Sequence, residues 1–421
     1  MTAPRAATET WRALAVWAVG LAAYVVAVTG RTSLGVAGLE AVDRFGISAS
    51  VLATFSVVQL GVYAAAQIPA GMLLDRLGSR TLIASGALVL AVGQLLLAAA
   101  ETVPVALCAR LLIGLGDAMT LISVLRLVVA WFPSRRVPLL TQLTAMLGQL
   151  GQVVSALPFA VLLRTEGWAP AFATLGGSGV LVAVLVIAAV RDRPAERGRT
   201  PEVPGSRGGV VSVLRRPESW QGFFAHLLTL FPANSFLFLW GMPFLTVGQG
   251  LPATVAGALI SATVVVGFVV GPTVGVLTGR FPHRRVVIVL ATVTCSTLAW
   301  CSVLLPSGPR PLWQLALLML AVGAGVATCS IGFDFPRTAL PPQDLGTATG
   351  MVNVGGYSGS LLAVLLMGLV LDVLAPSGDF GLADLRMAFA AQGFLLALGL
   401  VGLAVALRAG RRRAATPSTA A

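Results

Sequence analysis

Long hydrophobic runs dominate the chain, and short polar segments rich in arginine separate them. Each run approaches the roughly 20 residues that a helix needs to cross a bilayer. Most runs are apolar on every side, which is typical of membrane spans and not of surface helices. The pattern predicts an all-α integral membrane protein with twelve transmembrane helices. The predicted spans are 12–36, 49–73, 82–100, 104–130, 138–163, 168–190, 219–247, 253–279, 285–306, 311–334, 346–374 and 384–408.

A polar segment in the middle of the chain divides the predicted spans into two sets of six. Residues 191–218 contain Pro, Gly, Ser and many Arg, which is typical of a flexible connector. We therefore expect an N-terminal six-helix bundle over residues 1–190, a cytoplasmic linker over 191–218, and a C-terminal six-helix bundle with a short basic tail over 219–421.

Composition and charge agree with a membrane location. Only 10% of the 421 residues are charged and 57% are hydrophobic, whereas soluble domains carry about 25% charged residues. Every basic residue is Arg or one of two His. The arginines gather in the loops on the side of the N-terminus, so the positive-inside rule places both termini in the cytoplasm. The net charge of +12 then reflects topology and contact with anionic lipids, not nucleic acid. We expect a multi-pass protein of a bacterial cell (inner or plasma) membrane.

The two halves repeat a loop signature. The loop after the second span contains Gly71, Arg76 and Arg80, and the loop after the eighth contains Gly275, Arg280 and Arg284 at the same spacing. The second loop has lost an acid, because Gly279 stands where the first loop has Asp75. Parallel repeats of this kind are typical of two-bundle transporters that bind substrate near the middle of the membrane.

Two motifs carry a family resemblance. The segment from Gly71 to Arg80 resembles the loop signature of the major facilitator superfamily, and the segment from Arg110 to Asp117 resembles its fourth-helix motif. The resemblance implies the major facilitator fold, and it implies that Asp75 sits at a helix N-terminus, where the helix dipole favours an anion. The gating residues that it implies are Gly71, Asp75, Arg76, Gly78, Arg80, Arg280 and Arg284. The alternative is that these charges are only solvated loop residues.

The first span resembles a particular branch of that superfamily. The run from Tyr24 through Arg31, followed by Phe45-Gly46-Ile47-Ser48, is similar to the anion:cation symporters and the organophosphate and sugar-acid carriers. The resemblance implies that Arg31 binds a carboxylate or phosphate, since a guanidinium holds such anions with two parallel hydrogen bonds. The alternative is an internal ion pair between Arg31 and Asp117. The seventh span offers no second arginine, so a monocarboxylate or zwitterion is favoured over a doubly charged phosphate ester.

Other polar residues within the spans are candidates for the substrate pocket. Gln59 and Tyr63 are four residues apart, as are Asn353 and Tyr357, so each pair shares a helix face. Each could instead hydrogen bond between helices. The remaining substrate-binding candidates are Arg126, Gln149, His226, Asn234 and Trp240.

Ionisable residues inside spans are costly and usually functional. Asp117, with Arg110 and Arg126 on the same span, is the main candidate for carrying a coupling proton. His226 is the second candidate, because the usual histidine pKa of about 6.5 suits a proton switch.

The sequence therefore predicts a secondary active transporter, not an enzyme, that moves a small organic anion or zwitterion together with protons. We expect a monomer in the lipid bilayer without nucleic acid, cofactor or metal, since the four cysteines lie in apolar runs without a ligand pattern. A drug or natural-product efflux antiporter of the same superfamily is the alternative. Those exporters usually carry a G-x-x-x-G-P motif in the fifth span, which is missing between Gly148 and Pro158. A transporter-derived sensor or a membrane enzyme is disfavoured, because no extramembrane domain is predicted.

Overall fold

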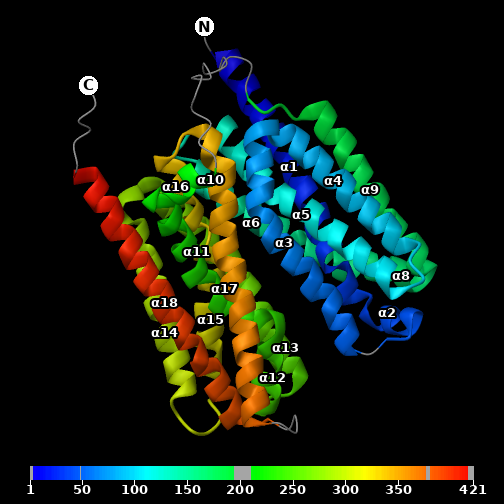
Figure 1. The fold of residues 1–421 in the computed structure, drawn as a ribbon, viewed down its shortest axis with the longest axis vertical. Helices are drawn as coiled ribbons and strands as arrows, with labels where there is room; N and C mark the ends of the chain where they lie inside the picture. Colours follow the sequence, from blue (N-terminus) through cyan, green and yellow to red (C-terminus); the bar gives the residue numbers. More distant parts are fainter. Residues whose placement is uncertain (1–2, 48, 194–209, 376–379, 416–421) are drawn as a thin grey trace. The chain divides into compact units, whose positions relative to one another are not determined.

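The computed structural model describes residues 3–47, 49–193, 210–375 and 380–415, and every regular element in these ranges is a helix (Figure 1). The chain forms two compact units. The first contains residues 1–210 and 341–350, and the second contains residues 211–340 and 351–421. The break at residues 210 and 211 lies within the segment that the sequence marks as a linker.

The first unit is built from long helices. They are α1 (Ala3–Val36), α2 (Gly38–Phe45), α3 (Ala49–Leu77), α4 (Ser79–Ala98), α5 (Val103–Trp131), α6 (Val137–Gly148), α7 (Leu150–Val154), the π-helical turn η1 (Ser155–Phe159), α8 (Ala160–Glu166) and α9 (Trp168–Ala189). Helices α4 and α5 approach closely because glycines face each other: a Cβ atom on Gly116 would lie 2.4 Å from the Gly86 carbonyl oxygen. Small residues at such contacts are what hold helices together in a membrane.

The second unit contains more irregular helices. They are α10 (Val210–Leu214), α11 (Pro217–Ser235), η2 (Phe236–Trp240), α12 (Gly241–Pro243), η3 (Phe244–Gly248), α13 (Ala253–Arg280), η4 (Pro282–Arg284), α14 (Arg285–Leu304), α15 (Leu312–Thr328), α16 (Ile331–Ala339), η5 (Pro342–Asp344, in the first unit), α17 (Leu345–Leu374, shared between the units) and α18 (Leu382–Ala415). Its core is aromatic. The rings of Trp300 and Phe389 are stacked with 4.8 Å between their centroids, and Phe236 and Phe244 pack against them.

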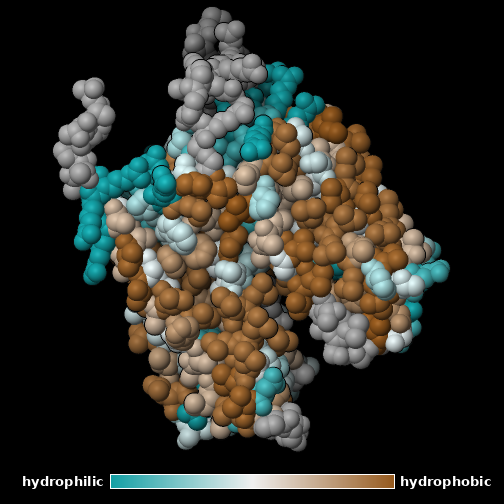
Figure 2. Space-filling view, in the orientation of Figure 1, coloured by the Kyte–Doolittle hydropathy of each residue, from teal (hydrophilic) through white to brown (hydrophobic). Residues whose placement is uncertain are grey.

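Eleven helical segments of the described ranges are long and apolar enough to cross a membrane. The predicted seventh span is not among them. In this region α11, η2, α12 and η3 follow one another between Pro217 and Gly248. Pro243 provides no N–H for the helical hydrogen-bond ladder, and π-helical turns take up such breaks. Figure 2 shows hydrophobic side chains over most of the visible surface, with hydrophilic side chains gathered near helix ends. An exposed surface of this kind matches a lipid environment.

Candidate functional site

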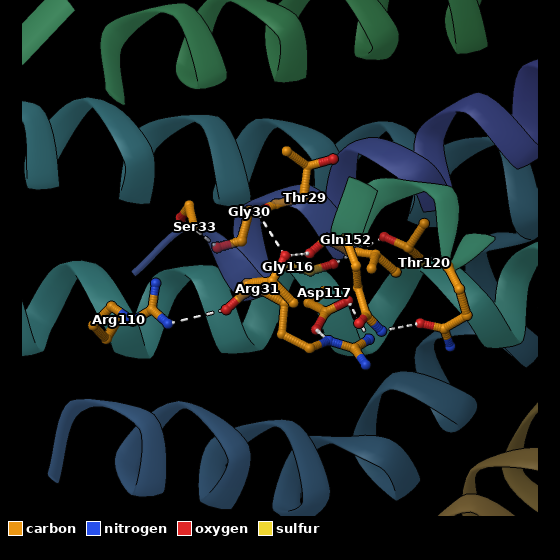
Figure 3. A network of polar contacts seen from close by, with 12 residues as sticks. Thr29, Gly30, Arg31, Ser33, Arg110, Gly116, Asp117, Thr120 and Gln152 are labelled. Atoms are coloured by element: carbon orange, nitrogen blue, oxygen red, sulfur yellow. Dashed lines mark hydrogen bonds and ion pairs between the residues drawn. The ribbon is translucent and has the colours of Figure 1, made fainter. Parts of the chain in front are cut away.

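The first unit buries an ion pair between α1 and α5. Arg31 donates from Nε to Asp117 Oδ2 at 2.6 Å and from Nη2 to Asp117 Oδ1 at 2.9 Å (Figure 3). The Asp117 side chain is fully buried, whereas the Arg31 side chain keeps 15% of its surface exposed. A planar guanidinium matched to both oxygens of a carboxylate is the strongest geometry for such a pair. Arg31 is therefore the accessible member of the pair, and Asp117 is the shielded one.

A second buried guanidinium lies beside this pair. Arg110 on α5 donates from Nη2 to the Arg31 carbonyl oxygen at 3.2 Å, while its Nε and Nη1 atoms find no hydrogen-bond partner among the described residues. Arg31 and Arg110 are the two cations whose charges act on Asp117, whereas the sequence had placed Asp117 between Arg110 and Arg126. Two guanidinium groups and one carboxylate leave this cluster with one excess positive charge. A buried excess charge within a membrane span is costly, so this cluster is a candidate functional site.

Helix α3 completes the surroundings of Arg31. The Tyr63 ring lies under the guanidinium, with 4.7 Å between the ring centroid and Arg31 Cζ. This is the distance of a cation–π contact, which holds the guanidinium plane in place. Gln59 lies one helical turn before Tyr63, and both side chains are buried. The structure therefore brings the predicted residues Arg31, Tyr63 and Gln59 into one region of the first unit.

Helices α6 and α7 close this region from another side. Gly151 touches α1 so closely that a Cβ atom on it would lie 2.4 Å from the Val25 carbonyl oxygen, and Thr29 Oγ1 donates to the Gly151 carbonyl oxygen at 3.1 Å. Gln149, at the junction of α6 and α7, is half-buried and accepts a hydrogen bond from Gln152. The hydrogen-bonded amide side chains of Gln149 and Gln152 therefore lie beside the close contact between α1 and α7.

The predicted gating residue Asp75 sits at the end of α3, against the start of α17. Its Oδ1 accepts from the Gly346 N–H at 2.8 Å, and its Oδ2 accepts from the Thr347 N–H at 2.8 Å and from Thr347 Oγ1 at 2.7 Å. All these residues belong to the first unit. A carboxylate at the first turn of a helix satisfies backbone N–H groups that lack helical partners and interacts favourably with the helix dipole.

Arg126 belongs to the Asp75 cluster. Its Nη1 atom lies 2.5 Å from Asp75 Oδ1. The sequence had grouped Arg126 with the substrate-binding residues and with Asp117, because one helix carries both. The helix is long enough to separate them: Asp117 and Arg126 are nine positions apart on α5, which is about 13 Å along the helix axis at the standard rise per residue.

The other loop residues of the predicted gating set have more modest roles in the first unit. Gly71 lets α3 approach residue Gly346, whose carbonyl oxygen would lie 2.4 Å from a Cβ atom on Gly71. Gly78 has φ of 82°, a conformation that favours glycine. Arg76 and Arg80 are exposed, and the Arg80 N–H donates to Asp192 Oδ1 at 2.8 Å.

The predicted residues of the second unit form neutral contacts between helices. His226 Nδ1 lies 2.8 Å from the Cys329 carbonyl oxygen, Asn234 Nδ2 donates to Ser360 Oγ at 3.1 Å, and Trp240 Nε1 donates to the Val364 carbonyl oxygen at 3.3 Å. Asn353 is buried and Tyr357 is half-buried one turn further along α17. These contacts tie α11 and η2 to the helices around them.

Three positions that the sequence analysis did not single out take part in charged contacts. Thr347 and Gly346 bind Asp75, and Asp334 on α16 pairs with Arg337 at 2.7 Å between Asp334 Oδ1 and Arg337 Nη2. The signal for Asp334 was present, because an acid and an arginine three positions apart on a helix face each other. No local pattern indicates Thr347, since its partner is 272 residues away.

Comparisons with known proteins agree with the transporter geometry. The family profile described as Major Facilitator Superfamily matches residues 20–363. The chain is 24% identical over 345 residues to the "Probable galactarate/D-glucarate transporter GudP" of Bacillus subtilis, covering 74% of this chain and 75% of that protein. It is 22% identical over 394 residues to the "Probable sulfoacetate transporter SauU" of Cupriavidus necator, covering 89% of both. It is 26% identical over 220 residues to the "Probable L-galactonate transporter" of Escherichia coli, covering 52% of this chain and 47% of that protein.

Solved structures share the fold. The transporter FucP in its outward conformation superposes with a TM-score of 0.65 at 16% identity, covering 91% of this chain and 98% of that one. The proton:xylose symporter XylE, bound to 6-bromo-6-deoxy-D-glucose, superposes with a TM-score of 0.66 at 14% identity, covering 93% of this chain and 95% of that one.

Proposed function

Because the chain belongs to the Major Facilitator Superfamily and is a multi-pass membrane transporter, we propose that it carries a small carboxylate-bearing organic anion or zwitterion across the cell membrane together with a proton. Transport occurs by alternating access of a binding site that contains Arg31. The twelve spans form two six-helix bundles with both termini in the cytoplasm, so the interrupted segment from α11 to η3 is the seventh span.

The buried pair of Arg31 and Asp117 is the observation that carries this proposal. Arg31 presents its two donor nitrogens to the Asp117 carboxylate at 2.6 and 2.9 Å. A substrate carboxylate has the same shape and charge, so it competes with Asp117 for the same guanidinium. Protonation of Asp117 removes its negative charge and releases Arg31 for the substrate. Proton and anion are therefore taken up together, and the charge of the cluster is unchanged by the exchange.

The surroundings of Arg31 support a pocket that recognises a polar organic molecule. The ring of Tyr63 holds the guanidinium from one side, and the buried amide of Gln59 is available for hydroxyl or carbonyl groups. Gln149, between α6 and α7, is a further polar candidate for substrate contact. Arg110 keeps the local charge positive when Asp117 is neutral. His226, Asn234, Trp240, Asn353 and Tyr357 remain the candidate substrate contacts of the second unit, and the contacts of the first three with neighbouring helices are neutral.

The names of the relatives support a carboxylate-bearing substrate. Their names refer to galactarate, glucarate, galactonate and sulfoacetate, which all carry at least one carboxylate. Arg31 is the sole guanidinium proposed for direct contact, so a single carboxylate is the minimal recognised group. We expect monocarboxylates such as galactonate to bind at least as well as dicarboxylates such as galactarate.

Uptake by purified protein in proteoliposomes tests the proposal. A panel of galactonate, galactarate, glucarate and sulfoacetate is offered with and without an inward proton gradient, and we expect gradient-driven accumulation of at least one of them. Asp117→Asn should abolish this accumulation but keep substrate exchange at equal pH on both sides. The exposed acid Glu101, changed to Gln, is the matched control and should behave as the wild type. Gradient-driven accumulation by Asp117→Asn at the wild-type level would show that protons are not carried by Asp117.

A further inference from the structure

The turn between α13 and α14 concentrates positive charge at a membrane boundary. Arg280 and Arg284 are exposed, and both guanidinium groups lie over the same ring: Cζ is 5.6 Å from the Phe281 centroid for Arg280 and 5.2 Å for Arg284. The backbone holds this arrangement, because the Phe281 N–H donates to the Leu277 carbonyl oxygen at 2.8 Å and the Arg284 N–H donates to the Phe281 carbonyl oxygen at 2.9 Å. We call residues 280–285 the arginine turn.

The equivalent turn between α3 and α4 has two acids beside it. There, Asp75 directly precedes Arg76, and Asp192 accepts from the Arg80 backbone N–H. In the arginine turn, Gly279 stands at the position of Asp75, and neither Arg280 nor Arg284 makes an ion pair within the described ranges. The repeated turn therefore has acids next to its arginines in one unit and lacks the corresponding acid in the other.

The acid on the interior side of the arginine turn, Asp334, is paired with another arginine. Arg285 is directed inward, where its Nη1 donates to the Asp334 carbonyl oxygen at 2.9 Å and to Thr338 Oγ1 at 3.0 Å. The Asp334 carboxylate is already occupied by Arg337. The Arg285 Nε atom is buried and finds no partner among the residues described. Four arginines and one aspartate leave this end of the second unit with a charge of about +3, counting one charge per ionised side chain.

The flanking helices present an apolar surface next to these charges. Val276 and Leu277 at the end of α13 and Val287 near the start of α14 are all exposed. Both helices are candidate membrane spans, so we expect these side chains to face acyl chains next to the turn. Cations at the boundary above an apolar, lipid-facing surface match the two parts of a phospholipid, its headgroup and its chains.

We propose that the arginine turn binds the phosphodiester headgroup of an anionic phospholipid, with the guanidinium groups of Arg280 and Arg284 as its ligands. An anion between two like charges removes their mutual repulsion, and guanidinium groups match phosphate oxygens geometrically. The acyl chains of the same lipid lie along Val276, Leu277 and Val287. The site is separate from the Arg31 cluster and does not depend on the identity of the transported solute.

Lipid titration of the detergent-purified full chain tests this site. Phosphatidylglycerol or phosphatidylcholine is added to the wild type, and the bound lipids are counted by native mass spectrometry while the thermal midpoint is followed. We expect phosphatidylglycerol to bind and stabilise the protein. We expect Arg280→Gln/Arg284→Gln to weaken its apparent affinity about thirtyfold, because each of the two arginines near a lipid headgroup contributes on the order of one kcal/mol. Gly279→Asp, which restores the acid of the first loop and keeps both arginines, should also weaken binding.

A matched pair of exposed arginines separates a site from general charge attraction. Arg135 and Arg136 follow α5 in the first unit, and their change to Gln removes the same charge. This control should keep wild-type affinity for phosphatidylglycerol. An equal loss in both double variants, or an unchanged affinity in Arg280→Gln/Arg284→Gln and Gly279→Asp, would overturn the proposal. Competition by millimolar inorganic phosphate as strong as that by the lipid would also overturn it, since it would identify a soluble anion as the ligand.

Discussion

The two units of this transporter bury their polar groups in different ways. In the first unit, Arg31, Arg110 and Asp117 form a charged cluster between α1 and α5. In the second unit, an ion pair of Asp334 and Arg337 lies on α16, whereas the contacts of α11 are neutral: Asn234 donates to Ser360, and Ser235 Oγ donates to Gln392 Oε1 at 2.8 Å. The free energy of the Arg31 cluster depends on charge. The neutral contacts of α11 depend on helix positions.

This difference suggests a division of labour within a repeated scaffold. A buried charge is expensive, and it is stable only while its partners stay in place. A neutral hydrogen bond between helices contributes about 1 kcal/mol and tolerates small shifts. The proposed ion and substrate chemistry is therefore assigned to the first unit, and the proposed role of the second unit is to supply neutral contacts. The experiments below test this division, beginning with the largest expected effect.

Removal of the Arg31 guanidinium should have the largest effect on transport. Arg31→Gln/Asp117→Asn replaces the ion pair by two neutral amides of similar size, so the first unit is not left with an unpaired buried carboxylate at this position. We expect the variant to adopt the native structure. Its substrate exchange should decrease at least a hundredfold, which corresponds to about 2.7 kcal/mol of lost binding to a charged group. Exchange of labelled organic acid in proteoliposomes measures this loss, and the thermal midpoint checks the fold.

Arg31→Lys is the informative companion to that variant. It keeps the positive charge but loses the planar pair of donors, so an intermediate activity is expected. Wild-type exchange by the neutral double variant would mean that the pair only holds α1 and α5 together, and the contrast between the units would then lose its functional meaning.

The close contact between α1 and α7 predicts the next largest effect, on stability. Gly151→Val would force side-chain atoms against α1, where the Thr29 backbone nitrogen lies 2.8 Å from a Cβ atom on residue 151. We expect a destabilisation of about 3 kcal/mol or more, because backbone atoms cannot move aside as side chains do. Thermal unfolding in detergent measures it.

Gly267 on α13 provides the matched control for Gly151. A Cβ atom on Gly267 would meet nothing within 4 Å. Gly267→Ala should therefore leave the thermal midpoint unchanged or raise it slightly, since alanine favours the helix by about 1 kcal/mol relative to glycine. Equal effects of the two substitutions would contradict a close packing role of Gly151.

Asp75→Asn should slow transport by about tenfold, corresponding to about 1.4 kcal/mol. The substitution keeps one acceptor for the N–H groups of Gly346 and Thr347 but removes the charge that pairs with Arg126. The maximal exchange rate at saturating substrate measures this decrease in transport. Asp192→Asn is the control, because Asp192 also accepts a backbone N–H at 2.8 Å but lies outside this cluster. A rate equal to that of the wild type would limit Asp75 to a structural role.

Much of the fold followed from the sequence because membrane spans are long and apolar. Nearly all predicted spans correspond to candidate spanning helices, and the all-helical architecture is confirmed. The predicted seventh span contains Pro232, Gly241 and Pro243, and in the structure the α-helix changes to π-helical turns in the same region. Local composition is sufficient for these features, since a proline or a π-helical turn acts within a few residues.

The pairing of side chains was less predictable, because it depends on contacts between distant segments. Arg31 and Asp117 are 86 positions apart, and their ion pair was one of two alternatives that the sequence left open for Arg31. Helix rotation decides which residues meet, and nothing in a nearly uniform apolar helix reveals that rotation. Asp75 was expected at a helix N-terminus from its motif, but its partners Gly346 and Thr347 lie 271 and 272 positions away.

His226→Gln should have the smallest effect and is the sharpest test of the division between the units. His226 is buried in the second unit, and its Nδ1 lies 2.8 Å from the Cys329 carbonyl oxygen. Gln keeps a neutral donor of similar reach, so exchange should fall no more than about threefold, corresponding to about 0.6 kcal/mol. Accumulation driven by a proton gradient should persist, because the coupling proton is assigned to Asp117. If His226→Gln abolishes this accumulation and Asp117→Asn keeps it, proton chemistry lies in the second unit, and the contrast between the Arg31 cluster and the neutral contacts of α11 describes helix packing rather than transport.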